Sequence, residues 1–211
     1  MQHQDAAEPT PVPPRQIRAA FTERTVTVYQ AYPPVIGEHA ARHGAFPASW
    51  SRSRMTWIKP SFRWMMYRSG WGTKPGQEVV LALEISRAGF ESALAGAVLS
   101  HYDAAVHTDR EAWTERLRQS TVRVQWDPER DLDLNALPHR SLQLGLAGRA
   151  TRDYADHWLG SVRDVTPLAH RVRELVRAGD RTAAAALLPA EAPYPPLPEA
   201  VARELRASPP T

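Results

Sequence analysis

The chain has 211 residues, is 43% hydrophobic, and carries 26 Lys and Arg against 23 Asp and Glu, which gives a net charge of +3. This length provides one substantial core and leaves no room for a second folded domain, so a single domain is expected. The absence of cysteine excludes disulfides, thiolate nucleophiles and zinc sites built on Cys ligands. The small net charge does not by itself indicate nucleic acid, because only local clustering of cations would be informative.

The ends of the chain differ in composition from its middle. Residues 1–14 are polar and rich in proline and are predicted to be a disordered leader, followed by a folded domain at 15–188 and a proline-rich tail at 189–211. No apolar run approaches the roughly 20 residues of a membrane span, and the polar start lacks an apolar signal core. We therefore expect a cytoplasmic protein with no membrane partner.

The first half of the domain alternates between extended and helical patterns. Residues 25–32, TVTVYQAY, are β-branched and aromatic with near alternation, which predicts a strand ended by the two prolines that follow. Residues 34–46 predict a short helix closed by a glycine. Residues 55–58 are again extended, whereas residues 61–69 fit a helical turn or a strand, because periodicity alone does not separate the two.

The second half begins with the clearest buried strand, QEVVLALEI at residues 77–85. A turn and then a helix are expected over residues 87–100. Further helices are predicted at 109–118, near 150–160 and over 165–188 with a break near Gly179, and further strands at 120–129, with a turn at Pro128, and at 139–148. The sum is an α+β domain with a mixed, mostly antiparallel sheet of about five or six strands flanked by helices.

Several common catalytic motifs are missing from the sequence. There is no GxxxxGK[ST] phosphate loop, no GxGxxG after a strand, no GxSxG elbow and no HExxH pair. These absences argue against kinases, Rossmann dehydrogenases, serine hydrolases of that class and zincins. His39 and His43 have the i, i+4 spacing of a metal-binding pair, but surface histidines on helices are far commoner, so no metal site is expected.

Residues 51–77, here called the basic aromatic segment, hold six cations and five aromatic residues and no Asp or Glu. Guanidinium groups bind phosphate oxygens in bidentate fashion, and indole and phenol faces stack on bases or on a nicotinamide-like ring. The segment therefore predicts a nucleotide ligand. The alternative is a buried aromatic segment whose arginines extend to the surface.

Two cations of this segment are the favoured phosphate ligands. Arg68 lies between Tyr67 and the turn at Ser69 and Gly70, where neighbouring rings can hold a guanidinium. Lys59 is one of two lysines among the 26 cations of the chain. It is either a phosphate ligand of the site or a residue left over from a general preference for arginine.

Five runs together resemble an uncharacterised family, domain of unknown function 4291. The resemblance covers roughly residues 15–196, and its most specific part is the long tryptophan-rich run. The runs are RQIRAAF at 15–21, TVYQAY at 27–32, RMTWIKPSFRWMMYRSGWG at 54–72, QWDPER at 125–130 and RSLQLGL at 140–146.

A second resemblance concerns residues 27–47, which look like the first strand and helix of ADP-ribosyltransferase-like domains. This resemblance implies an ADP-ribosyltransferase-like fold with NAD as a substrate. It further implies that Arg15 or Arg18, with Gln30, orients the ribose and phosphates of NAD, and that Tyr67 or Trp71 covers the nicotinamide. Gln30 stands where many of those domains have a histidine.

The same resemblance implies a carboxylate that holds a ribose hydroxyl and supports an oxocarbenium-like transition state. Glu129 is the first candidate and Glu78 the second. Asp127 and Glu129 stand together at the end of a predicted strand, where a carboxylate can project into a cleft. Capping of the turn beside Pro128 would explain the same pair.

Three functions remain open from the sequence. An NAD-dependent ADP-ribosyltransferase or glycohydrolase would need a deep cleft lined by arginine, aromatic and carboxylate groups. A non-catalytic nucleic-acid-binding module would use residues 52–74 along a broad, shallow groove and bind in a salt-dependent way. A protein acting through surface contacts with another protein would bury the aromatic residues in its core.

Overall fold

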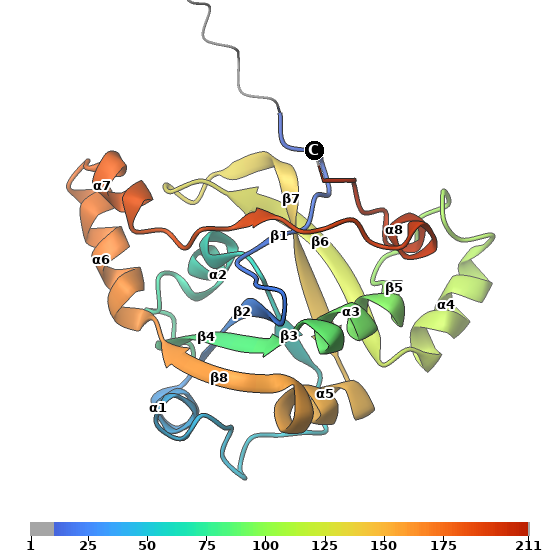
Figure 1. Cartoon of the computed structure of the whole chain (residues 1–211), viewed down its shortest axis with the longest axis horizontal. Helices are drawn as coiled ribbons and strands as arrows, with labels where there is room; N and C mark the ends of the chain where they lie inside the picture. Colours follow the sequence, from blue (N-terminus) through green and yellow to red (C-terminus); the bar gives the residue numbers. More distant parts are fainter. Residues whose placement is uncertain (1–10, 211) are drawn as a thin grey trace, which may run out of the picture.

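The strands of the computed structural model, which describes residues 11–210, form three sheets (Figure 1). In the three-stranded sheet, β4 (Val79–Ser86) lies between β2 (Thr25–Tyr32) and β8 (Leu159–Asp164) and is antiparallel to both. The predicted α+β class with mostly antiparallel strands is confirmed, although the strands are divided among sheets rather than joined in one. The part of the leader before residue 11 lies outside the described residues.

The second large sheet has four strands, and a small pair lies apart from it. The pair of β5 with β6 is parallel, and the other pairs are antiparallel. In spatial order the four strands are β3 (Thr56–Ile58), β7 (Ala136–Leu146), β6 (Val122–Arg130) and β5 (Ala97–Leu99), and the small pair is β1 (Arg18–Ala19) with β9 (Ala192–Pro193).

Two of the four-stranded sheet's features differ from the sequence prediction. The strand expected to turn at Pro128 continues to Arg130, because β5 pairs with β6 only at residues 122–124 and leaves the edge beside the proline unpaired. Proline lacks an N–H and is tolerated at such an edge. The three-residue strand β5 was not predicted, since so short a segment has no period of its own.

The two large sheets are joined next to β3. The Tyr29 backbone N–H on β2 donates to the Lys59 carbonyl at 2.6 Å, and these two residues form an isolated bridge. Lys59 follows directly after β3, so this bond fixes its backbone between the two sheets. The lysine therefore starts from the centre of the molecule rather than from a surface loop.

The first two helices have clear end signals. Helix α1 (Pro34–His43) starts with a proline and ends at Gly44 with φ of 68°, as the sequence predicts. Residues 61–69 prove helical: the Ser61 side chain accepts a hydrogen bond from the Trp64 N–H at 3.1 Å, and α2 (Phe62–Ser69) ends at Gly70 in the left-handed region.

The remaining helices surround the sheets. Figure 1 shows α6 and α7 at one end of the molecule and α4 at the opposite end. Among the described residues, no helix is both long and apolar enough to cross a membrane. The helices are α3 (Arg87–Ala95), α4 (Arg110–Gln119), α5 (Arg149–Asp153), the π-helical turn η1 (Tyr154–Trp158), α6 (Thr166–Arg177), α7 (Arg181–Ala186) and α8 (Glu199–Leu205).

Strand β4 separates two hydrophobic cores. Leu81 and Leu83 face the larger core, whereas Val80 and Ala82 face a smaller one that includes residues of α2 and α6. Because both faces of β4 are buried over residues 79–83, these five residues are all apolar and lack the alternation of a half-exposed strand. Because residues of α2 belong to the smaller core, this helix of the basic aromatic segment packs into the core on that face of β4.

The proline-rich segment after residue 189 crosses the molecule as the red strand and coil between α7 and α8 (Figure 1). It pairs with β1 through β9. Tyr194 and Leu205 from this segment are buried in the larger core. Hydrophobic burial therefore attaches the segment to the domain.

Candidate functional site

A cavity of about 860 Å³ opens between the two large sheets. Its walls come from β2, β3, α2, β6 and β7 and from the loops around residues 49–55 and 76–77. Such a volume is within the range of pockets that take small molecules and cofactors. The basic aromatic segment supplies many of the walls, so the position predicted for a ligand coincides with a real concavity.

Lys59 is the buried cation of this cavity. Its side chain is 7% exposed, and Nζ donates to the Trp57 carbonyl at 3.2 Å and lies 5.2 Å from the centre of the Trp64 ring. Within residues 11–210, no carboxylate lies within 4 Å of Nζ. Burial, and secondarily the positive charge of Arg68, lowers the pKa of Lys59 to about 7 against the opposing effect of Asp127.

Two exposed arginines add positive charge at the cavity. Arg68, on α2, donates from Nη1 to the Gln77 side-chain oxygen at 3.2 Å. Arg54 lies in the loop before β3 and also lines the cavity. In the described part of the chain neither guanidinium forms an ion pair, so both retain donors for an anionic ligand.

Asp127 is the one acidic residue among those that line the cavity. Its Oδ1 accepts a hydrogen bond from Gln125 Nε2 at 2.9 Å, and its Oδ2 accepts one from Gln143 Nε2. Gln125 and Gln143 face each other across β6 and β7 in register. The two amides therefore hold the carboxylate in one orientation, and no cation within 4 Å among residues 11–210 neutralises it.

Gln30 lines the cavity, but its polar atoms already have partners. Nε2 donates to Thr56 Oγ1 at 2.7 Å and to the Trp57 carbonyl at 3.0 Å, and Oε1 accepts from the Tyr154 hydroxyl at 2.6 Å. The Trp57 carbonyl thus accepts from both Gln30 and Lys59. Gln30 is suited to fixing the end of β3 more than to binding a ligand directly.

Three tryptophans line the cavity, Trp50, Trp57 and Trp64, and the last two belong to the basic aromatic segment. Trp57 packs over Gly145 of β7 so closely that a Cβ on that glycine would lie 2.9 Å from the indole ring. Trp64 is 7% exposed, and its buried Nε1 has no hydrogen-bond partner among the described residues. Both rings line the cavity, where an apolar or aromatic ligand group can pack against them.

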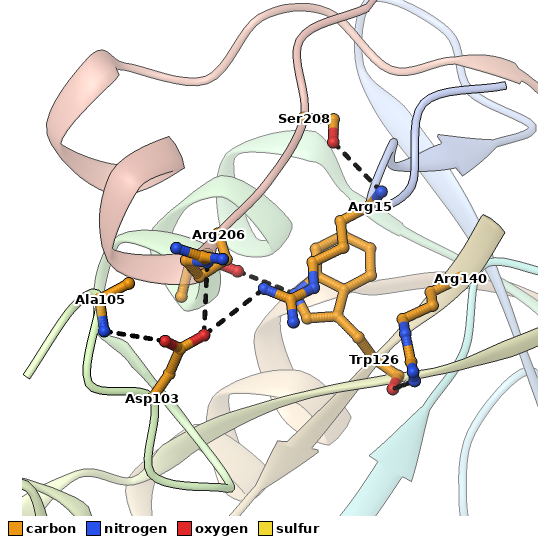
Figure 2. A network of polar contacts seen from close by, with 8 residues as sticks. Arg15, Asp103, Ala105, Trp126, Arg140, Arg206 and Ser208 are labelled. Carbon is orange, nitrogen blue, oxygen red and sulfur yellow. Dashed lines mark hydrogen bonds and ion pairs between the residues drawn. The ribbon is translucent and has the colours of Figure 1, made fainter.

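Other residues expected at the site lie elsewhere. Figure 2 shows Arg15 beside Asp103 and Arg206: Arg15 Nη1 lies 3.7 Å from an Asp103 oxygen, and Arg206 Nε lies 3.3 Å from the same oxygen. The Arg15 N–H also donates to Ser208 at 3.2 Å. Arg18 donates to Gln16 and to the Glu191 carbonyl. These two arginines connect the ends of the folded region and do not line the cavity.

Tyr67 and Trp71 are also outside the cavity wall. Tyr67 is 40% exposed and lies between Lys74 and the Arg130 guanidinium, whose Cζ is 3.6 Å from the ring centre. Trp71 is buried in the smaller core and has φ of 61° between two glycines that also have positive φ. Trp71 therefore shapes the loop that carries Gln77 to the cavity.

The two candidate catalytic glutamates are not among the lining residues. Glu129 is 4% exposed, and its Oε1 accepts from the Arg130 N–H at 2.7 Å. The pairing of β6 with β7 becomes irregular between Pro128 and Arg130, so the alternation that points Gln125 and Asp127 into the cavity ends there. Glu78 accepts from the Gly76 N–H at 2.9 Å at the edge of the site.

A half-buried acid, Glu191, lies at the start of α2. Its Oε1 accepts from the Phe62 N–H at 2.7 Å. Burial, opposed by the Phe62 hydrogen bond and reinforced by the charge of Glu129, raises the pKa of Glu191 to about 8. Glu191 thus anchors the helix that carries Arg68, and nothing in its local sequence indicated this role.

The cavity brings together three of the residues named from the sequence, Gln30, Lys59 and Arg68. Gln125 and Gln143 also line it and were not named from the sequence. The signal was present in the i, i+2 spacing of Gln125 and Asp127 on one strand face. Placing Gln143 opposite them required the register of two strands.

Together these features define an α+β protein with a polar cavity that combines unpaired cations, indoles and one fixed carboxylate. The chain belongs to the family described as Domain of unknown function (DUF4291), whose model matches residues 16–194. No curated protein matches the chain. The family description assigns no activity.

Proposed function

We propose that this protein is a nucleotide-binding transferase whose ligand occupies the cavity between the two large sheets. The observation that supports this most directly is the convergence of Arg54, Lys59 and Arg68 with Trp57 and Trp64 on one concave space. Guanidinium groups without carboxylate partners bind phosphates, and indoles pack against a base or a nicotinamide ring.

Burial of one ring of the basic aromatic segment favours a mononucleotide or dinucleotide over a nucleic-acid strand. Trp71 is 6% exposed, lies in the smaller core and does not line the cavity, so it cannot stack on unpaired bases without leaving its packing. A strand-binding surface would present such rings on a broad groove. NAD, ADP-ribose and ATP are therefore the ligands to test first.

The proposal also assigns a carboxylate. If the reaction is transfer from NAD through an oxocarbenium-like transition state, Asp127 is better placed than Glu129 or Glu78, because it alone of the three lines the cavity. Gln125 and Gln143 would keep it oriented toward the ligand.

Calorimetric titration tests the proposal. The full chain is titrated with NAD, ADP-ribose, ATP and a short single-stranded oligonucleotide at low and moderate salt. We expect saturable nucleotide binding that weakens little with salt. Arg68→Ala should weaken it by about 10-fold or more, since a hydrogen bond to a charged group contributes roughly 1.5–3 kcal/mol.

Arg118→Ala is the matched control. Arg118 is exposed on α4, pairs with Glu115 and does not line the cavity, so its removal lowers the charge equally without touching the site. Equal effects of the two variants would contradict the assignment of the cavity. Binding of the oligonucleotide alone, with steep salt dependence, would contradict the nucleotide proposal itself.

A further inference from the structure

The buried cation of the cavity is a lysine, and an arginine at the same position would differ in its protonation. Of the 26 cations in the chain, two are lysines, Lys59 and Lys74. Lys74 is exposed, and its Nζ donates to the carbonyls of Tyr67 and Arg68. Lys59 is buried at the cavity wall. Arginine binds phosphate at least as well but stays protonated, whereas a buried lysine can present a neutral amine.

The surroundings of Lys59 favour that neutral form. Nζ is enclosed by the Trp57 carbonyl and the Trp64 ring, and within the described chain no carboxylate pairs with it. The bond from Tyr29 to the Lys59 carbonyl fixes the backbone from which the side chain extends. A desolvated lysine near another cation is an activated nucleophile. Arg68 is that neighbouring cation.

The arginines offer a place for an electrophile. Arg54, Lys59 and Arg68 line the same cavity, so a phosphate bound by the two arginines would relieve the repulsion among these cations and share that space with Nζ. Holding a nucleophile and a phosphorus atom close together in one site raises the rate of the reaction between them. Asp127, fixed by two amides and free of any ion pair among the described residues, is available to accept a proton.

We propose that Lys59 is a covalent nucleophile that accepts a nucleotidyl group from a nucleotide containing a phosphoanhydride bond. Nζ attacks the phosphorus next to the nucleoside, an N–P bond forms, and the P–O bond to the next phosphate breaks. The leaving group is pyrophosphate from a nucleoside triphosphate or nicotinamide mononucleotide from NAD. The amine proton passes to Asp127 and then to water, and the product is a phosphoramidate on Lys59.

The cavity's arginines have a defined part in this step. Negative charge increases on the leaving phosphate as the P–O bond breaks, and preoriented guanidinium groups stabilise it. The inference rests on the proposed function, because it requires a nucleotide in the cavity. It adds the bond that is cleaved and the residue that is modified.

The first measurement is intact mass of the full chain after incubation with ATP or NAD in buffer containing Mg²⁺. We expect an added mass of one nucleoside monophosphate, labelled by ³²P in the phosphate next to adenosine and not by the γ-phosphate of ATP. The adduct should be labile in acid and stable in alkali, as phosphoramidates are. Peptide mapping should place it on Lys59. The donor that gives the adduct identifies the leaving group.

Two variants complete the experiment. Lys59→Arg places a permanently protonated guanidinium at the position and should abolish the adduct, while Lys74→Arg, which removes the only other lysine, should leave it unchanged. Circular dichroism establishes whether each variant is folded. If Lys59→Arg does not fold, peptide mapping of the wild-type chain still shows which residue carries the adduct.

The outcomes separate the two proposals. Calorimetric binding of ATP or NAD without any adduct would overturn the covalent step and leave nucleotide binding standing. An adduct that maps outside Lys59, or that persists in a folded Lys59→Arg variant, would overturn the assignment of the nucleophile. Absence of both binding and adduct would overturn the proposed function together with this inference.

Discussion

Lys59 lies buried at the cavity wall, where its amine lowers the stability of the fold. In the unfolded chain its amine is solvated and ionises normally, whereas in the folded protein burial disfavours the ammonium form. Nothing in the described structure compensates this cost with an ion pair. Functional sites commonly retain such unfavourable groups.

Replacing Lys59 with methionine should therefore stabilise the protein. Because the pKa of Lys59 falls from 10.5 when exposed to about 7 when folded, wild-type stability is lost as the pH falls from about 10 to 7. We expect Lys59→Met to raise the free energy of unfolding at pH 7 by roughly 1–4 kcal/mol. Urea unfolding at pH 7, 8 and 9 measures the difference.

The pH dependence distinguishes this effect from better packing. The gap between wild type and Lys59→Met should widen as the pH falls toward 7, because folding of the wild type must remove from Lys59 a proton that the unfolded chain retains more strongly at lower pH. Lys74→Met, at an exposed lysine, should show no such trend. A gap that stays constant from pH 7 to 9 would mean that Lys59 is not desolvated in the folded protein.

At the scale of secondary structure, α2 determines how the cavity is built. Ser61 caps its first turn, Glu191 binds its first N–H, and the helix then presents Trp64 and Arg68 to the cavity. The sequence left this segment open between helix and strand. The serine cap and the left-handed Gly70 show why the helical form is adopted.

Ser61→Ala should both destabilise the protein and weaken ligand binding. Loss of an N-cap costs about 1 kcal/mol, and fraying of the first turn would move Trp64. Asp109→Ala is the matched control, because Asp109 caps α4 through the Ala112 N–H, outside the cavity. Thermal unfolding and nucleotide titration of both variants provide the comparison.

We expect similar losses of stability from the two cap substitutions and a loss of nucleotide affinity from Ser61→Ala alone. If Asp109→Ala weakened binding as much, general loosening of the fold would explain the effect. In that case α2 would have no particular part in the site.

At the scale of the whole molecule, the ends of the folded region stabilise each other. β1 pairs with β9, and Arg15 and Arg206 share Asp103 (Figure 2). Ion pairs between partly solvent-exposed side chains, as here, contribute little. The burial of Tyr194 and Leu205 in the larger core is the stronger connection.

Leu205→Ala should lower the free energy of unfolding by about 2–5 kcal/mol in a single transition, as expected for a fully buried leucine. Leu187→Ala, at a side chain that is 40% exposed, should cost far less. Urea unfolding followed by both fluorescence and circular dichroism tests this. Equal small losses would show that the C-terminal segment is not part of the cooperative unit.

The sequence alone determined the features that depend on neighbouring residues. The strand at 25–32, the helix closed by Gly44 and the composition of the basic aromatic segment all follow from local preferences. The segment's cations and rings are also the basis on which a nucleotide ligand is proposed.

Only the tertiary structure decided which residues share the cavity. Asp127 and Gln143 meet because β6 and β7 pair in one register, and Glu129 is excluded because that register becomes irregular beside Pro128. Glu191 reaches α2 across more than a hundred residues of chain. Register and long-range packing depend on which surfaces bury each other, and no local pattern encodes that choice.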